Sequence, residues 1–140
     1  MFTVEKVIQD IWILNEAGIV LFSRVFNPRV NDQLFGGLMS ALNTFAENIS
    51  DGGLSNFVIK DKKYIIMKQY GLLFIVNSSK NVKEKKVNEE MKSIVKKFFK
   101  IYPKEMLDTW NSDISIFADF EKHIKNSLQD TIDKFERAFW

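Results

Sequence analysis

The chain has 140 residues and a formal charge of +2, which gives no reason to expect nucleic acid as a partner. Its length suits one domain, residues 1–140, and an apolar fraction of 46% with thirteen Phe excludes general disorder. The absence of cysteine excludes disulfides and thiolate metal sites. No stretch approaches the ~20 apolar residues that span a bilayer, and no signal peptide is visible, so we expect a cytoplasmic protein.

Two short apolar runs, residues 11–14 and 19–22, begin the ordered part of the chain. Residues 15–18 separate them, and Gly18 can adopt a positive φ at low cost, which predicts a tight hairpin. Both runs are apolar at consecutive positions, as is typical of strands that are covered on both faces.

A helix is predicted next, with Asn31 as its N-cap and residues 50–53 as its end. Its large apolar residues recur at steps of three and four, and we expect this stripe to face the core. The stripe comprises Leu34, Phe35, Leu38, Met39, Leu42, Phe45, Ala46 and Ile49.

Three further strands follow, at residues 54–60, 63–69 and 72–76, with turns at Asp61-Lys62 and Gly71. From Val82 the period is helical again, until Pro103 ends the helix. Its apolar residues lie on one side and comprise Val87, Met91, Ile94, Val95, Phe98, Phe99 and Tyr102. A final helix is predicted from Phe117 to Phe139, with apolar residues at steps of three or four.

This order of elements predicts an α+β fold: a three-layer sandwich with a mainly antiparallel sheet of five strands. The order is strand, strand, helix, three strands and two helices. One helix precedes the last three strands and two follow them, so both faces of the sheet can be covered.

The chain resembles the longin family, which has a profilin-like fold, over residues 7–102. The hairpin at residues 11–26, the helix at 34–49 and the strands between Asn56 and Val76 carry the resemblance, and the last helix matches the family's third. A roadblock-type domain is the close alternative, although such domains usually begin with a helix before the first strand, and residues 1–6 leave little room for one.

Catalytic and cofactor motifs are missing from the sequence. His123 is the only histidine, so no histidine–cysteine set can hold a metal, and no acidic loop has calcium-binding spacing. The serines are not in a nucleophile elbow, and the glycine pairs at 36–37 and 52–53 do not fit phosphate-binding loops. We expect no enzyme, no cofactor and no metal.

The second helix, residues 82–101, is strongly basic. Residues 80–104 hold nine Lys against three Glu, and residues 105–140 hold eight acidic residues against four basic ones. Contact with anionic lipid headgroups is one interpretation; its candidate residues are Lys85, Lys86, Lys96 and Lys97. The simpler interpretation, which we prefer, is a solvated helix face beside a complementary acidic helix.

The first helix differs sharply, because only Asp32 and Glu47 are charged between residues 31 and 50, against ten charged residues between 82 and 101. An interior pair of glycines weakens a helix by ~1 kcal/mol per glycine but lets another backbone approach closely. Low charge is also typical of interface centres. The predicted partner contact comprises Arg24, Asn27, Gly36, Gly37, Ser40, Asn43 and Thr44.

The longin resemblance implies a non-enzymatic platform of membrane-traffic machinery, which pairs with another longin domain or binds a small GTPase. We therefore expect an interaction module that forms a homodimer and binds or regulates a small GTPase. A roadblock-type GTPase regulator and a peripheral domain that binds anionic membranes through residues 82–101 are the alternatives.

Overall fold

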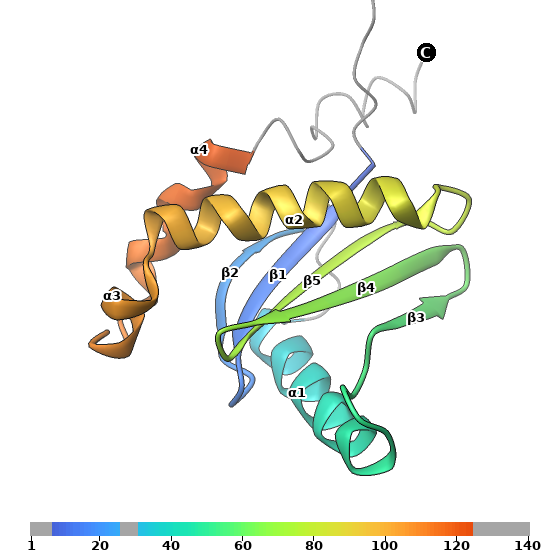
Figure 1. The fold of residues 1–140 in the computed structure, drawn as a ribbon, viewed down its shortest axis with the longest axis horizontal. Coiled ribbons are helices and arrows are strands. Elements are labelled where there is room, and N and C mark those ends of the chain that lie inside the picture. Colours follow the sequence, from blue (N-terminus) through green and yellow to red (C-terminus); the bar gives the residue numbers. More distant parts are fainter. Residues whose placement is uncertain (1–6, 26–30, 125–140) are drawn as a thin grey trace, which may run out of the picture.

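The computed structural model describes residues 7–25 and 31–124 of the chain. The elements follow in the predicted order through the second long helix (Figure 1). They are β1 (Asp10–Asn15), β2 (Val20–Arg24), α1 (Asp32–Ile49), β3 (Asn56–Ile59), β4 (Lys62–Gln69), β5 (Leu72–Ser79), α2 (Glu84–Ile101), α3 (Lys104–Asp108), the 3₁₀ helix η1 (Ile114–Phe120) and α4 (Glu121–Ile124).

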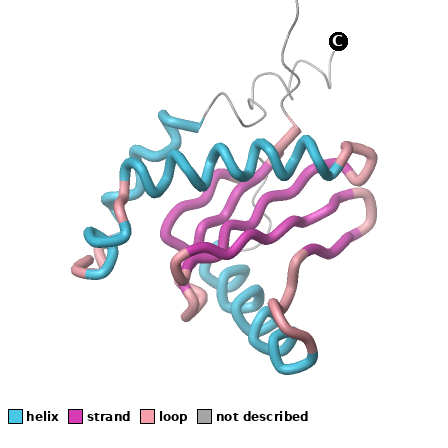
Figure 2. The backbone as a smooth tube through the Cα atoms, viewed as in Figure 1, coloured by secondary structure: helices cyan, strands magenta, loops and turns pink. Residues whose placement is uncertain are grey.

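The five strands form one sheet (Figure 2). Its order is β2-β1-β5-β4-β3, and all neighbouring strands are antiparallel. Because β1 and β5 are central and lie between two helical layers, their consecutive apolar residues are buried. The turn between β3 and β4 consists of Lys60 and Asp61, one residue earlier than predicted, because Lys62 already pairs with Ile59. Lys60 has a φ of 55° in this turn.

One face of the sheet is covered by α2. Its predicted apolar stripe is confirmed, since Val87, Met91, Ile94, Val95 and Phe98 are all buried. Alternate residues of the central strands, including Ile11, Ile13, Phe74 and Val76, belong to the same core. Phe98 lies at its centre, with Phe74 at a ring distance of 5.4 Å and Phe120 at 5.2 Å.

The other face of the sheet carries a smaller core under α1. Here the intervening residues of the central strands, such as Trp12, Leu73 and Ile75, pack with Met39 of the helix. The helices therefore lie on both faces of the sheet, and the predicted three-layer α+β sandwich is confirmed.

The end of the described chain differs from the predicted long helix. Phe117, Phe120 and Ile124 are fully buried, as their spacing indicated, but residues 114–120 form a 3₁₀ helix. A spacing of three residues matches the three residues per turn of that helix and brings Phe117 and Phe120 onto one side. The rest of the predicted helix, from residue 125, lies outside the described residues.

Tyr102 joins α2 to this segment, because its hydroxyl donates a hydrogen bond of 3.0 Å to the carbonyl oxygen of Ile116. Burial, and secondarily the nearby Asp119 carboxylate, raise the pKa of Tyr102 above its ordinary value of 10.0. The folded state therefore keeps the hydroxyl proton at a pH at which the unfolded chain releases it. The stabilising contribution of the hydroxyl is complete below pH 10 and is lost as the pH rises above 10.

We therefore expect Tyr102→Phe to lower the free energy of unfolding by about 1 kcal/mol at pH 8, the usual worth of one hydrogen bond. The difference between the two proteins should shrink above pH 10, as measured by urea denaturation at both pH values. Comparing them at each pH cancels the titration of the lysines. A difference that stays constant across this range would contradict the assignment.

Candidate interaction surface

The inner face of α1 is built from small residues that sit directly on the β1–β2 hairpin. A Cβ atom on Gly36 would clash with the carbonyl oxygen of Gly18 and lie 2.7 Å from Cγ2 of Val20. Gly18 itself has a φ of 87°, and a Cβ there would lie 2.9 Å from the carbonyl oxygen of Gly36. The helix and the turn therefore touch backbone to backbone, which no larger residue at either position would allow.

Polar side chains on the same face hold the helix in place. The Gln33 side chain accepts a hydrogen bond of 3.0 Å from the Val20 amide and donates one of 3.3 Å to the Val20 carbonyl. The Ser40 hydroxyl donates a bond of 2.6 Å to the carbonyl of Glu16. The first turn is capped as predicted, because the Asn31 side chain accepts from the amides of residues 33 and 34.

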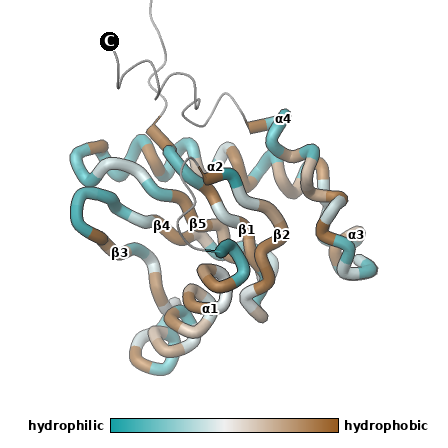
Figure 3. Tube along the Cα trace, turned by 180° about the vertical axis from the view of Figure 1, so that it is seen from behind, coloured by the Kyte–Doolittle hydropathy of each residue, from teal (hydrophilic) through white to brown (hydrophobic). Residues whose placement is uncertain are grey.

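The predicted core stripe of α1 is wrong for most of its length. Met39 is buried, and Phe35 stacks on Trp12 at a ring distance of 4.3 Å. The other large residues are exposed: Leu34 (70%), Leu38 (56%), Leu42 (40%), Phe45 (65%) and Ile49 (70%). The close approach at Gly36 turns the opposite side of the helix outward, and these five residues form what we call the α1 outer stripe. Figure 3 shows α1 as a mainly hydrophobic helix.

The β3 strand continues the exposed apolar surface after α1. It is an outer strand of the sheet and pairs with β4 within the described chain. Phe57 stacks on Tyr64 at 4.7 Å, whereas Val58 and Ile59 are 54% and 58% exposed. An outer strand has unpaired amide and carbonyl groups along its free side, so it is a ready site for pairing with another strand.

The residues predicted for partner contact are therefore divided between different environments. Gly36 and Asn43 are buried within the protein, and Ser40 is bonded to the hairpin. Gly37 has open space around it, Thr44 is exposed, and Arg24 lies 3.5 Å from Glu121 in an ion pair. Asn27 lies outside the described residues. The contact itself stays a prediction, but the protein's own hairpin occupies the face on which it was centred.

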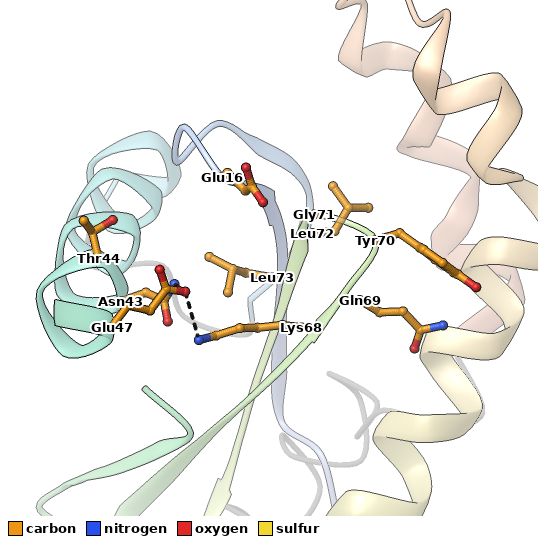
Figure 4. Close-up of a pocket in the computed structure, with 10 residues that line it drawn as sticks. All are labelled: Glu16, Asn43, Thr44, Glu47, Lys68, Gln69, Tyr70, Gly71, Leu72 and Leu73. Carbon is orange, nitrogen blue, oxygen red and sulfur yellow. Dashed lines mark hydrogen bonds and ion pairs between the residues drawn. The ribbon is translucent and has the colours of Figure 1, made fainter. Parts of the chain in front are cut away.

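A polar cavity of about 370 Å³ lies between α1 and the end of the sheet (Figure 4). Glu47 accepts a 3.0 Å hydrogen bond from Asn43 and pairs with Lys68 at 3.4 Å. Lys68 also donates to the carbonyl of Gly52, and Asn43 accepts from the Leu54 amide at 3.3 Å. These contacts tie the end of α1 to β4, and we assign this network a positioning role.

The basic residues of α2 lie on the side of that helix away from the sheet. Lys85, Lys86 and Lys96 are exposed and Lys97 is half-buried. Within the described chain, no set of three or more His, Cys, Asp or Glu side chains is placed to hold a metal ion. The helices described also include none that is long and apolar enough to cross a membrane.

Comparison with known proteins identifies solved structures of similar fold but no matching family model or curated relative. No family model and no curated protein matches the chain. Among solved structures, MglB from Myxococcus xanthus matches at a TM-score of 0.55 and 12% identity, over 68% of this chain and 83% of MglB. A roadblock/LC7 domain from Streptomyces avermitilis matches at 0.54 and 16%, over 69% of this chain and 85% of that domain.

At these identities the likeness concerns the fold alone, and the longin family as such is not confirmed. The matching structures have the roadblock-type fold, which the sequence analysis kept as the close alternative. The protein has a roadblock/LC7-type, longin-like fold, with one antiparallel sheet between two helical layers.

Proposed function

We propose that the protein is a non-enzymatic interaction module that pairs with a second copy through the α1 outer stripe and β3. The observation that carries the proposal is the stripe itself: five large apolar side chains, 40–70% exposed, on one side of a single helix. Exposed apolar side chains are common singly, but a contiguous patch of this kind is typical of an interaction site.

Burying the α1 outer stripe against a second protomer would contribute enough free energy to support a dimer. Burying each partly exposed Leu, Ile or Phe side chain contributes roughly 1–2 kcal/mol, so five contribute on the order of 5–10 kcal/mol per protomer. Association costs at least about 4 kcal/mol and often more in lost freedom of motion. The stripe alone therefore supports a modest dimer, and hydrogen bonds along β3 would strengthen it.

Symmetry favours a second copy as the occupant. A two-fold axis brings the same patch of both protomers together, so the patch must be complementary to itself. An uncharged apolar stripe meets this condition without repulsion. A two-fold axis perpendicular to the sheet would also pair β3 with its copy in antiparallel fashion, and would leave both α1 helices on the same side of the extended sheet.

We further propose that the paired protein binds a small GTPase. This part rests on the longin resemblance of the sequence, and the roadblock/LC7-type fold is compatible with it. No nucleotide-contacting residue is assigned, and the surface opposite the stripe remains accessible in such a dimer.

Sedimentation equilibrium of the unmodified chain tests the pairing. We expect a mass near twice 16.4 kDa, falling towards the monomer value on dilution. A mass of 16.4 kDa at all attainable concentrations would contradict it. The GTPase proposal is tested separately, by identifying the small GTPases that co-purify with the chain from native extract; their absence would remove that part and leave the pairing intact.

A further inference from the structure

The outward side of α2 carries an unusual concentration of lysine. Lys85, Lys92, Lys96 and Lys100 are exposed, and Lys97 beside them is half-buried. None of these five makes an ion pair with a residue that the structure describes. We call this set the α2 lysine face. It lies on the other side of the sheet from α1, so a second copy on the α1 outer stripe would leave it open (Figure 1).

The acidic residues that the structure describes near α2 do not neutralise this face. Glu84 pairs with Lys63 of β4 at 2.5 Å, and Glu89 is the one exposed acidic side chain among residues 85–100. An acidic helix within residues 105–140 was predicted to lie beside α2. The acidic residues of this segment that the structure describes pair with other partners. Asp119 pairs with Lys122 at 3.6 Å, and Glu121 pairs with Arg24 at 3.5 Å.

The kind of basic residue indicates the kind of partner. The face has lysine but no arginine, and the aromatic residues of α2, Phe98 and Phe99, lie in or against the core. Protein interfaces are depleted in lysine and enriched in arginine and aromatic residues. Nucleic-acid sites commonly use arginine for base contacts and aromatic rings for stacking. A charged bilayer needs only clustered positive charge, and clusters of four to eight basic residues on an amphipathic helix are typical of such binding.

We propose that the α2 lysine face docks on a bilayer surface that contains anionic lipid headgroups. Residues 85–100 of a straight helix span about 22 Å, so the lysines can contact several headgroups together. The apolar side of α2 is buried against the sheet and cannot enter the bilayer. The attraction is therefore electrostatic and strongly weakened by salt, since the Debye length falls from about 10 Å at 0.1 M to about 3 Å at 1 M.

The test is co-sedimentation of the full chain with vesicles of phosphatidylcholine and phosphatidylserine, and with vesicles of phosphatidylcholine alone. We expect binding to the mixed vesicles only, and its loss in high salt. Each lysine near such a surface contributes about a fivefold factor to partitioning. Lys92→Glu/Lys96→Glu should therefore lower partitioning by at least about 25-fold, and Lys92→Gln/Lys96→Gln is a milder variant in case the first folds poorly.

The matched control is Lys60→Glu/Lys62→Glu, which changes the net charge equally at two lysines beside the turn between β3 and β4 rather than on α2. We expect this variant to keep most of the binding. Equal losses in both variants would show a general charge effect and overturn the proposal. So would equal binding to both vesicle types, unchanged binding of the α2 variants, or retention on duplex nucleic acid without retention on vesicles. A monomeric chain that still binds the mixed vesicles would support this proposal while contradicting the pairing.

Discussion

Gly36→Ala should destabilise the fold, whereas Gly37→Ala, one residue further along the same helix, should stabilise it. A methyl group at Gly36 would clash with the Gly18 carbonyl and press on Val20, so α1 would have to move off the hairpin. Overpacking of this kind costs about 1–3 kcal/mol. We expect a net loss near 2 kcal/mol, because the helix itself gains from alanine.

Gly37 provides the matched control, because a Cβ there would meet no atom within 4 Å. Replacing this helical glycine by alanine removes only freedom of the unfolded chain, so we expect a gain of about 0.5–1 kcal/mol. Urea denaturation at one fixed protein concentration measures both changes without interference from pairing. Changes of the same sign would contradict the inner face assigned to α1.

Leu38→Glu/Phe45→Glu should abolish the pairing that we propose through the α1 outer stripe. In a two-fold dimer the change places four carboxylates in an apolar contact, where each loses water without gaining a partner. We expect the dissociation constant to rise at least about 100-fold, equivalent to about 2.7 kcal/mol. Sedimentation equilibrium measures the change directly.

The fold should survive this double substitution, because the two side chains are 56% and 65% exposed and surface changes usually alter stability by under about 0.5 kcal/mol. Asn81→Glu/Ala118→Glu adds the same charge at exposed positions away from α1 and β3 and should pair normally. If the α1 variant still forms dimers with an unchanged dissociation constant, the second copy is not seated on the α1 outer stripe.

Much of the fold follows from local sequence signals. The consecutive apolar residues predict the strands β1, β2 and β5, Asn31 predicts the start of α1, and Pro103 predicts the end of α2. Each signal depends on neighbouring residues alone. The α2 stripe was also placed correctly, because one side of that helix is apolar and the other is charged, which leaves a single way to bury it.

Local sequence signals did not predict which side of α1 faces the sheet. A stripe of Leu, Ile and Phe shows that one side of a helix avoids water, but it does not show whether the covering surface belongs to the same chain or to another. The side of α1 that faces the sheet is set by the close contact of Gly36 with Gly18. These residues are eighteen positions apart, so the contact is visible only in the folded chain. The one available signal was the polar set on the opposite side, since the side chains of Gln33, Ser40 and Asn43 bond to backbone groups of the β1–β2 hairpin and of the segment before β3.

Single-cysteine cross-linking tests the pairing on the α1 outer stripe most directly, because the natural chain has no cysteine. Leu38→Cys, Leu42→Cys and Phe45→Cys would be oxidised separately, with Lys96→Cys on α2 as the control. A disulfide requires Cα atoms within about 7 Å of each other. We predict that at least one stripe variant forms a covalent dimer rapidly while the Lys96→Cys protein stays monomeric. Cross-linking of all three stripe variants no faster than the control would contradict the account.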